Sequence, residues 1–527
     1  MRVLLLCDGG GSMGVGHVIR SLALAEAAVA AGHDVVVAGH FEGSFVQGQL
    51  AAAPVEVVQL AVPLADVDLQ PVIDVVRDQR PDVLHVDSYE ASLRLRELGE
   101  EVLSDVVVLS NVEDGTFGSR PADVVIDPTL GAELVARPDD GSTWLLRGSR
   151  YAPMRQRVLD ARRRGAAMAT ADSARRVLIV MGGTDPVGLA PAAVGLLAST
   201  GLPLEVTAIA VGANAERVRA AARGSALSLT VLAPVDDLAF VMSGQDLVIS
   251  AAGTSVWELC CIGVPMALVR AVDNQRDGYD RAVAADAAVG LGGPELVEPD
   301  GLGAQRGAEV LRRVLTDSPK RADMRLAGRR VVDGLGAWRV VRTWEQAHAR
   351  KGEERVGPAA LPGSIPLTAR PAGMDDARRL WEWRNDPVTR ASSRSSAEVS
   401  WEDHLSWLAA SLARSDRVLL VAEDPAGPVG TVRWDRRGER EWEVSITAAP
   451  ERRGQSLGRP LLRAGEVALS EVLPLGDASS NGPEVTAYLA VVHVDNAASV
   501  RLFESSAYLP DLPPDSRGYT RFRKLLG

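Results

Sequence analysis

Aromatic residues, cysteines and long apolar runs are all scarce in this sequence. Phe, Trp and Tyr make up 4% of its 527 residues, and the hydrophobic fraction of 46% comes mainly from Ala, Val and Leu. No run reaches the ~18 apolar residues of a transmembrane helix. The run Leu4-Leu5-Leu6-Cys7 resembles a lipoprotein cleavage site but is too short for the apolar region of a signal peptide. We therefore predict a first strand there and no membrane partner.

Disulfide bonds and a basic surface are equally unsupported by the sequence. The three cysteines, Cys7, Cys260 and Cys261, are too few for a disulfide framework, which favours a reducing, cytoplasmic location. The formal net charge is −12 and is spread along the chain, which argues against a nucleic-acid partner. A small anionic ligand contacts only a few residues of one site, so the net charge of the whole chain does not exclude such a ligand.

The length of the chain indicates several domains, because 527 residues exceed what one hydrophobic core serves. Apolar runs alternate with Ala-rich helical segments in two series, which indicates parallel sheets with helices on both faces. The predicted strands are 3–7, 35–38, 83–86 and 106–110 in the first series, and 177–181, 204–210, 227–232, 247–250 and 266–269 in the second. We predict two Rossmann-like domains, at 1–145 and 146–345, with a ligand between their strand carboxyl ends.

A different pattern follows these two series. Residues 346–366 show no apolar period and are predicted as a linker. Beyond them, a tryptophan-rich helical region precedes further strands and helices, which predict a third domain of the α+β class at 367–527. Its predicted elements are strands 418–422, 429–434, 442–447 and 485–491, with helices from Leu457 and Ala497.

The turn with the clearest chemical content is GVGHVIR at residues 14–20, which follows the first predicted strand. A strand, a glycine-rich loop and a helix N-terminus hold phosphates, because glycine allows close backbone approach and the helix end favours an anion. His17 stands at this N-terminus, where the positive helix end disfavours imidazolium. We predict that His17 is a neutral base near pH 7, beside a phosphate cradle.

Two other interpretations of this turn stay open. The sequence GGGSMG at 9–14 fits the GxGxxG fingerprint of NAD- and FAD-binding domains. That fingerprint needs an acidic residue at the end of the second strand, where this chain has Gly39-His40. In the other interpretation, the turn is structural and His17 only caps the helix.

Glycine-rich strand ends recur in the second series. Small residues, hydroxyls and backbone amides at a helix N-terminus suit a diphosphate. The predicted diphosphate ligands are Gly183, Thr184, Gly253, Thr254 and Ser255. Glu258 lies one helical turn further, where its carboxylate can accept both hydroxyls of a ribose; the alternative is a capping box with Ser255. Asn274 and Gln275 follow another strand, where their amides can bind sugar hydroxyls or form a common turn.

Together these motifs resemble the nucleotide-sugar hydrolase of pseudaminic acid biosynthesis. That enzyme has a GT-B-like fold similar to the lipid II glycosyltransferase, and it removes UDP from UDP-2,4-diacetamido-2,4,6-trideoxy-β-L-altropyranose. The resemblance spans residues 1 to about 345. The motifs follow in the same order and spacing: GVGHVIR, VDSY at 86–89, RYAPMR at 150–155, GGTDP at 182–186, SAAGTSVWELCCIGVP at 250–265, DNQ at 273–275 and VDGLGA at 332–337.

The resemblance implies roles for individual residues. His17 would prepare water for attack at the anomeric carbon, Glu258 would bind the ribose hydroxyls, and the glycine-rich loops would bind the diphosphate without a metal. Ser88 departs from the family, which more often has His there. The implied sugar-site residues are Gly16, Arg20, Asp87, Tyr89, Asn274 and Gln275.

The turn after strand 442–447 resembles the acetyl-CoA loop of GNAT N-acetyltransferases, whose pattern is Q/R-x-x-G-x-G/A. Arg453 and Gly458 match it, and Ser456 replaces the middle glycine but keeps its amide. The segment 494–508 resembles the second GNAT signature, in which Asn496 and a helix pack on the pantetheine arm. Taken alone, it is an N-capped helix. The implied acetyl-CoA ligands are Ile446, Arg453, Gly454, Ser456, Leu457, Gly458, Arg459, Asn496 and Ser499.

Two further predictions concern the group that protonates the CoA thiolate and the helices that would bind the acceptor amine. Many GNAT enzymes have a tyrosine acid where Phe503 stands, so Tyr508 or a water is predicted to protonate the thiolate. The helices before the strands look like the substrate-side helices of the pseudaminic-pathway acetyltransferase. Trp401, His404 and Leu408 share one helical face, which favours a core position; the alternative is His404 as base for the acceptor amine.

We therefore predict a bifunctional enzyme of nonulosonic acid biosynthesis. Its C-terminal domain would use acetyl-CoA to acetylate the 4-amine of a UDP-4-amino-4,6-dideoxy sugar, and its first two domains would hydrolyse UDP from the product. One alternative is a UDP-sugar glycosyltransferase with an accessory acyltransferase, in which a sugar hydroxyl replaces water. The other is a nucleotide-sugar sensor without catalysis.

Overall fold

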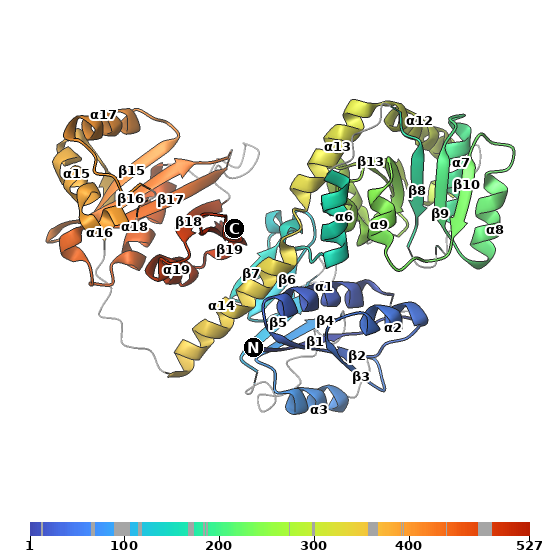
Figure 1. Ribbon diagram of the computed structural model, residues 1–527, viewed down its shortest axis with the longest axis horizontal. Coiled ribbons are helices and arrows are strands. Elements are labelled where there is room, and N and C mark those ends of the chain that lie inside the picture. Colours follow the sequence, from blue (N-terminus) through green and yellow to red (C-terminus); the bar gives the residue numbers. More distant parts are fainter. Residues whose placement is uncertain are drawn as a thin grey trace. The chain divides into compact units, whose positions relative to one another are not determined.

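The computed structural model divides into two compact units, Met1–Lys351 and Gly352–Gly527 (Figure 1). Among the described residues, no helix has the length and apolar character needed to cross a bilayer. The described residues are 1–11, 14–64, 69–88, 106–113, 119–166, 173–182, 185, 188–272, 275–297, 301–356, 367–391, 393, 395–438, 440–472 and 487–526.

The first unit begins with a seven-stranded parallel sheet in the order β3-β2-β1-β4-β5-β6-β7. The order reverses between β1 and β4, as in a Rossmann fold. Every residue of β1 after Arg2, and every residue of β4, is buried, because helices cover both faces of the sheet. The strands are β1 (Arg2–Cys7), β2 (Asp34–Gly39), β3 (Glu56–Gln59), β4 (Val83–Asp87), β5 (Val108–Val112), β6 (Val124–Asp127) and β7 (Trp144–Arg147). The helices are α1 (Gly16–Ala30), α2 (Ser44–Ala51) and α3 (Gln70–Gln79), with short 3-10 helices η2 (Ala132–Leu134) and η3 (Ser149–Tyr151).

A second parallel sheet in the same unit repeats this topology. Its order, β10-β9-β8-β11-β12-β13, reverses between β8 and β11. The strands are β8 (Arg176–Val180), β9 (Glu205–Ile209), β10 (Ser228–Leu232), β11 (Leu247–Ala251), β12 (Met266–Val269) and β13 (Ala288–Gly292). The helices are α6 (Gln156–Ala166), α7 (Leu189–Ser199), α8 (Gly212–Ala221), α9 (Leu238–Ser243), α10 (Ser255–Ile262), α11 (Arg276–Ala284), α12 (Leu302–Thr316) and α13 (Ser318–Val331), with η5 (Pro294–Val297).

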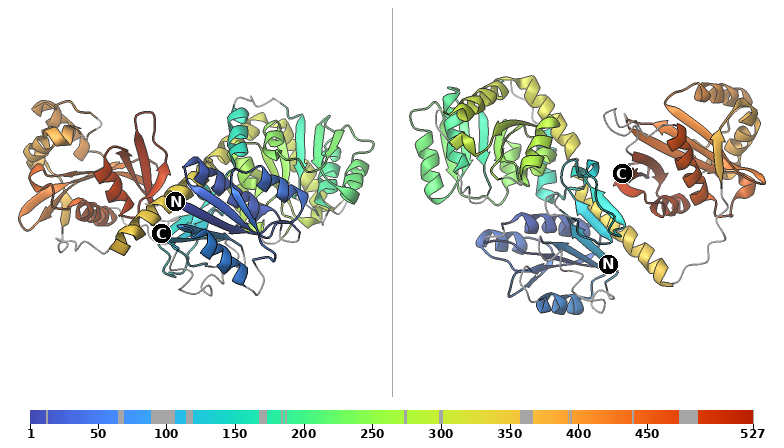
Figure 2. Two further views of the ribbon diagram at one scale, coloured as in Figure 1. Left: turned by 60° about the horizontal axis from the view of Figure 1, so that its bottom comes forward. Right: turned by 180° about the vertical axis from the view of Figure 1, so that it is seen from behind.

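Helix α14 (Gly336–Val356) ends the first unit and packs against its first sheet (Figures 1 and 2). Trp344 is fully buried, and its indole nitrogen donates to the hydroxyl of Ser110 on β5, at 3.0 Å. Glu345 pairs with His33 at 2.9 Å, and Lys351 pairs with Asp123 at 2.6 Å. A helix that follows the second domain thus contributes to the core of the first, which makes the two Rossmann-like domains one structural unit.

The second unit contains a mixed sheet in the order β14-β15-β16-β17-β18-β20-β19. Its neighbours are antiparallel except for β17 and β18, which are parallel. The strands are β14 (Thr368–Pro371), β15 (Arg417–Asp424), β16 (Gly427–Arg436), β17 (Glu441–Ala448), β18 (Ala487–His493), β19 (Leu509–Leu512) and β20 (Tyr519–Leu525). The helices are α15 (Ala377–Asn385), α16 (Pro387–Ala391), α17 (Trp401–Leu412), α18 (Gly458–Val472) and α19 (Ala497–Glu504), with η6 (Met374–Asp376) and η7 (Pro450–Arg452).

This architecture confirms the predicted fold class of two Rossmann-like domains and an α+β domain. The start of the predicted linker was wrong, because α14 continues through residues 346–356. That stretch is rich in Lys, Glu and Arg, which favour helix without supplying an apolar face. Residues 357–366 lie outside the described part of the chain. The sequence also missed β6 and β7, which are only four residues long.

We expect the two units to fold separately. Each has its own sheet or sheets and buried apolar clusters, and independent cores melt independently. Fragments 1–356 and 367–527 should each give a cooperative thermal transition close to the corresponding transition of the whole protein. Circular dichroism and calorimetry test this, and a fragment that stays unfolded alone would contradict the division.

Candidate active sites

The motif-bearing loops of the first unit lie where its two strand orders reverse. His17 follows β1 and Asp87 ends β4, the two strands that flank the reversal in the first sheet. Thr254 follows β11, which flanks the reversal in the second sheet. Neighbouring helices diverge at such a point and leave a crevice at the carboxyl ends of the strands, where ligands bind in open parallel sheets.

Asp87 joins His17 to Arg20. The Nδ1 of His17 lies 2.6 Å from Oδ1 of Asp87, and Arg20 donates to the two carboxylate oxygens at 2.7 and 2.9 Å. All three side chains are buried. The Nδ1–H of His17 therefore donates to Asp87, so the lone pair of a neutral ring lies on Nε2.

Burial alone would raise the pKa of Asp87, but the charges of Arg20 and His17 and their hydrogen bonds hold it well below its ordinary value. Asp87 is thus a carboxylate throughout the neutral range. The sequence placed Asp87 among the sugar ligands, whereas in the structure it contacts the predicted base.

The loop that carries His17 approaches the predicted diphosphate loop. A Cβ atom on Gly16 would lie 3.8 Å from Cγ2 of Thr254, in van der Waals contact. Gly253 similarly lies beside Gln275, whose Nε2 would be 3.7 Å from an added Cβ. The structure thus brings together residues from both Rossmann-like domains that are more than 200 positions apart.

Glu258 is not part of a capping box. Helix α10 begins at Ser255, its N-cap is Thr254, and no side chain caps it. Burial raises the pKa of Glu258 to about 7, against the lowering effect of Arg157 and Arg155. A carboxyl group that is partly protonated near neutrality is suited to exchange hydrogen bonds with a ligand.

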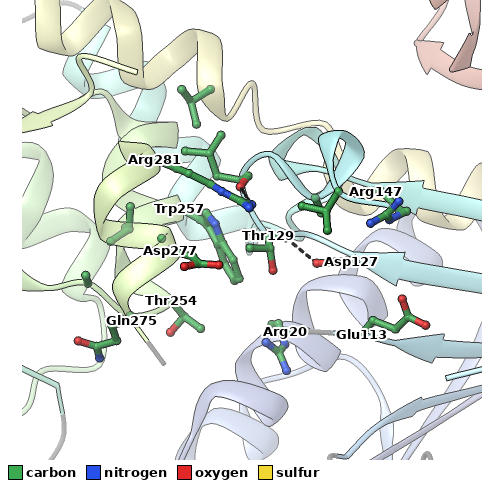
Figure 3. Close-up of a pocket in the computed structure, with 18 of the residues that line it drawn as sticks. Arg20, Glu113, Asp127, Thr129, Arg147, Thr254, Trp257, Gln275, Asp277 and Arg281 are labelled. Carbon is green, nitrogen blue, oxygen red and sulfur yellow. Dashed lines mark hydrogen bonds between the residues drawn. The ribbon is translucent and has the colours of Figure 1, made fainter. Parts of the chain in front are cut away.

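A cavity of about 400 Å³ lies between the two Rossmann-like domains (Figure 3). Four predicted residues line it, namely Arg20, Gly253, Thr254 and Gln275. Trp257 and Asp277 face Asp127 and Arg147 across this cavity, and Arg20 lies near its floor (Figure 3). The sequence analysis missed Glu113, Thr129, Arg137 and Arg281 as well as Asp127, Arg147, Trp257 and Asp277.

The missed residues had one detectable signal. Asp127 follows the short apolar run Val124-Val125-Ile126, which a search for strand ends could have found.

Among the remaining predicted ligands, Ser255 is the first residue of α10. Tyr89, Gly183, Thr184 and Asn274 lie outside the described residues. In the described part of the chain, no group of three or more His, Cys, Asp or Glu side chains is arranged to hold a metal ion.

The second unit has an opening between its two parallel strands. The pairing of β17 with β18 ends at Val444 and Ala490, although the strands continue to Ala448 and His493. Ile446 lies in the part of β17 that pairs with β16 but not with β18. The predicted acetyl-CoA loop follows that strand and leads into α18, whose first residue is Gly458. Backbone groups and a helix N-terminus therefore meet at this opening, as a pyrophosphate requires.

Ser456 adopts the backbone conformation of the glycine that it replaces. Its φ of +56° is left-handed, and Gly454 in the same loop has φ +79°. Arg453 points to helices α15 and α16, where its guanidinium donates to Asp386 at 2.5 Å and to Thr389 at 2.6 Å. Asn496 caps α19 by accepting from the amide of Ser499 at 3.1 Å, so the capping interpretation of Asn496 is confirmed.

Tyr508 and His404 occupy the interior of this unit. Tyr508 is fully buried, packs against Phe503 and donates its hydroxyl hydrogen to Glu466 at 2.9 Å. Burial raises its pKa, so its proton is engaged and poorly released to a thiolate. His404 is buried beside Trp401 and Trp407, and burial lowers its pKa, in agreement with the core position predicted for this helical face.

Comparison with known proteins identifies the C-terminal domain. Residues 367–507 match the family described as acetyltransferase (GNAT) domain. The second unit is therefore a GNAT acetyltransferase domain, and acetyl-CoA is its co-substrate. The match covers the opening between β17 and β18, the loop after β17 and helix α19.

Two relatives are similar to the chain in sequence. An uncharacterized protein of Methanocaldococcus jannaschii is 19% identical over 433 residues, which are 80% of this chain and 81% of that protein. The spore coat polysaccharide biosynthesis protein SpsG of Bacillus subtilis is 34% identical over 105 residues, which are 20% of this chain and 30% of that protein.

Two solved structures are also similar. MurG of Acinetobacter baumannii covers 66% of this chain and 99% of its own length, at 18% identity and a TM-score of 0.46. Spermidine N-acetyltransferase of Vibrio cholerae, crystallised with CoA and spermine, covers 31% of this chain and 96% of its own, at 19% identity and a TM-score of 0.27. The GT-B arrangement of the first unit rests on its own geometry, in which two Rossmann-like domains face one cavity.

We expect UDP affinity to depend on the ionisation of Glu258. Ribose hydroxyls donate to a carboxylate, so UDP should bind best when Glu258 is ionised, above pH 7. Below pH 7 the affinity should fall by up to about tenfold per pH unit. Calorimetric titration with UDP between pH 6 and 8 measures this change in affinity.

The Glu258→Gln variant is the matched control, because it keeps the shape of the side chain and cannot ionise. The affinity of this variant for UDP should change with pH only as far as UDP itself ionises. The same pH profile in both proteins would contradict ribose binding by Glu258.

The left-handed backbone at Ser456 yields a second prediction. Ser456→Val should lower the free energy of unfolding of the second unit by about 1–2 kcal/mol, because a β-branched residue is strained at positive φ. It should also weaken acetyl-CoA binding. Ser456→Gly, the control, should retain both properties, as chemical denaturation and acetyl-CoA titration would show.

Proposed function

We propose that this protein is a bifunctional nucleotide-sugar enzyme. Its first unit would hydrolyse a UDP-sugar with release of UDP, and its GNAT domain would acetylate the 4-amine of a UDP-4-amino-4,6-dideoxy sugar. In this proposal the hydrolase acts on the acetylated product, a UDP-2,4-diacetamido-2,4,6-trideoxy sugar, in pseudaminic or related nonulosonic acid biosynthesis.

The observation that carries the hydrolase proposal is the oriented histidine at the junction of two phosphate-binding loops. His17 is held by Asp87. The preceding residue, Gly16, lies near Thr254, because a Cβ added to Gly16 would be 3.8 Å from Cγ2 of Thr254. A base beside a helix N-terminus suits a reaction in which a diphosphate leaves while water attacks. A simple phosphate-binding turn would need neither the histidine nor its buried carboxylate.

The hydrolysis then follows from these residues. Nε2 of His17 accepts a proton from water as the water oxygen forms a bond to the anomeric carbon. The bond from that carbon to the diphosphate oxygen breaks, and UDP leaves with the electron pair. Asp87 stabilises the imidazolium that forms, and the amides of Gly253, Thr254 and Ser255 stabilise the departing diphosphate. His17 then releases its proton to solvent.

Acetyl transfer would occur in the second unit. The loop amides at residues 454–458 would bind the pyrophosphate of acetyl-CoA, and the opening between β17 and β18 would receive its pantetheine arm. A neutral amine of the acceptor sugar attacks the thioester carbonyl and forms the C–N bond, and its nitrogen loses a proton to water. The C–S bond breaks, and the CoA thiolate leaves and takes up a proton. Because Tyr508 donates to Glu466, we assign that proton to a water.

The similarity to a spore coat polysaccharide biosynthesis protein supports a role in sugar metabolism. The resemblance of the motifs in residues 1 to about 345 supports UDP and the diacetamido sugar as the ligands. We retain Tyr89 and Asn274 as proposed sugar ligands, and Gly183 and Thr184 as proposed diphosphate ligands. We also retain 1–145, 146–345 and 367–527 as proposed domain limits.

The decisive experiment replaces His17. His17→Asn removes the base and leaves the loop amides, so UDP release from the diacetamido sugar should fall about 10²–10⁴-fold with little change in UDP affinity. Mass spectrometry in heavy-oxygen water should show one labelled oxygen in the free sugar made by the wild type.

The control is His348→Asn. His348 lies on α14, where it pairs with Asp82, and it is outside the proposed site. It should retain wild-type turnover. Near-normal turnover in His17→Asn would contradict the proposed base, and transfer of the sugar to an acceptor hydroxyl without labelled free sugar would favour a glycosyltransferase.

A further inference from the structure

One wall of the cavity has chemistry that the proposed hydrolysis does not use. It is formed by the carboxyl ends of β5, β6 and β7, which carry Glu113, Asp127 and Arg147 (Figure 3). The reacting groups His17 and Asp87 belong instead to β1 and β4. The wall therefore faces a part of the ligand other than the bond that breaks.

Asp127 and Arg147 form a neighbouring acceptor and donor. They are register partners on the parallel strands β6 and β7. Asp127 is 4% exposed, and its Oδ1 accepts the amide hydrogen of Thr129 at 3.0 Å. A carboxylate can accept several hydrogen bonds, so Asp127 retains capacity for a ligand.

Arg147 has a buried donor with no partner. Its Nε has no hydrogen-bond acceptor within the residues that the structure describes. Buried polar groups are rarely left unpaired, because the loss of water costs free energy that only a hydrogen bond restores. A ligand acceptor in this cavity would satisfy it.

The other charged groups on this side are already engaged. Glu113 accepts the backbone amide of Arg120 at 2.6 Å and the guanidinium of Arg137 at 2.7 Å. Arg137 also donates to Asp140 at 2.8 Å. Arg281 donates to the carbonyl oxygen of Leu130. Among the described residues at the carboxyl ends of β5, β6 and β7, Asp127 has spare acceptor capacity and Arg147 has an unpaired donor.

A secondary amide complements this pair. Its N–H can donate to the carboxylate of Asp127 while its carbonyl oxygen accepts from the guanidinium of Arg147. Trp257, Leu130 and Val135 also line the cavity and offer apolar surface to a methyl group. A hydroxyl can also donate to Asp127 and accept from Arg147, but both bonds must then meet at one oxygen, whereas the amide carries its donor and its acceptor on separate atoms and adds an acyl methyl group. An ammonium group has no acceptor for Arg147.

The spacing of the strands agrees with a sugar substituent. β6 lies two strands from β4, which is about 10 Å at the usual separation of sheet neighbours. A pyranose ring whose anomeric carbon faces His17 can direct an N-acyl substituent across that distance. Arg20 links the two regions, because it donates to Asp87 and also lines the cavity.

We propose that Asp127 and Arg147 bind an N-acylamino group of the UDP-sugar and make the hydrolase select the acetylated substrate over its free amine. This inference rests on the proposed function. It would ensure that UDP is released only after N-acetylation, the reaction class of the GNAT domain on the same chain.

The test compares two substrates in the full-length protein. UDP release is measured without acetyl-CoA for the UDP-diacetamido sugar and for the corresponding UDP-4-amino sugar. The wild type should show the higher kcat/KM with the diacetamido sugar. Arg147→Met should lower that kcat/KM about 10- to 100-fold, the effect of one charge-assisted hydrogen bond, and should leave the value for the amine nearly unchanged.

Three further variants sharpen the result. Arg147→Lys, which keeps a donor but not the planar fork, should recover part of the preference. Asp127→Ala should lower the same kcat/KM, and the double variant should lose less than the sum of both effects, because both side chains bind one group. Arg350→Met is the matched control, since Arg350 stacks on Trp144 at the other end of β7 and does not line the cavity.

The outcomes separate this inference from the proposed function. Equal losses with both substrates in Arg147→Met, at unchanged UDP affinity and melting temperature, would overturn the inference while the hydrolase proposal stands. A wild type that prefers the amine would overturn it in the same way. A folded, UDP-binding wild type that releases UDP from neither sugar would overturn the hydrolase proposal and the inference with it.

Discussion

The buried carboxylate of Asp87 is the constraint on which the first unit's site depends. A lone carboxylate in this position would cost several kcal/mol of desolvation, but Arg20 and His17 both contact it. The two partners lie one helical turn apart on α1, so the ion pair fixes the rotation of that helix against β4. Orientation of the histidine is therefore a consequence of satisfying a buried charge.

The rest of the site follows from the repeated parallel topology. Each sheet contributes one point at which its strand order reverses, and each point supplies a loop that leads into a helix N-terminus. The predicted base follows β1, and the predicted diphosphate ligands Thr254 and Ser255 follow β11, so the proposed site needs both loops. Gly16 lies close to Thr254, since a Cβ added to it would be 3.8 Å from Cγ2 of Thr254. Helix α14 joins the two domains through the buried Trp344. The substrate can thus be bound from two sides.

In the GNAT domain, the backbone conformation of Ser456 and the side-chain contacts of Arg453 are features that the sequence motif does not specify. Ser456 departs from the family pattern in side chain, yet its backbone has the left-handed φ of a glycine, because the loop requires that conformation. Arg453 matches the pattern, but its guanidinium contacts Asp386 and Thr389. Asp386 follows α15 and Thr389 lies on α16, so this arginine connects the predicted acetyl-CoA loop to these two helices. Its role includes a structural contact that the motif does not reveal.

The sequence by itself determined the fold class, the glycine-rich strand ends and the GNAT domain, because these depend on local periodicity and on backbone conformations that few residues permit. Only the tertiary structure decided the partners of the side chains. Asp87 meets His17 across 70 positions, the capping box of Glu258 is absent because α10 begins at Ser255, and Tyr508 is buried against Glu466. Asp127 and Arg147 were missed as well, because the strands that end in them, β6 and β7, were not predicted. Such contacts follow from the order of strands in a sheet, which no local pattern of residues encodes.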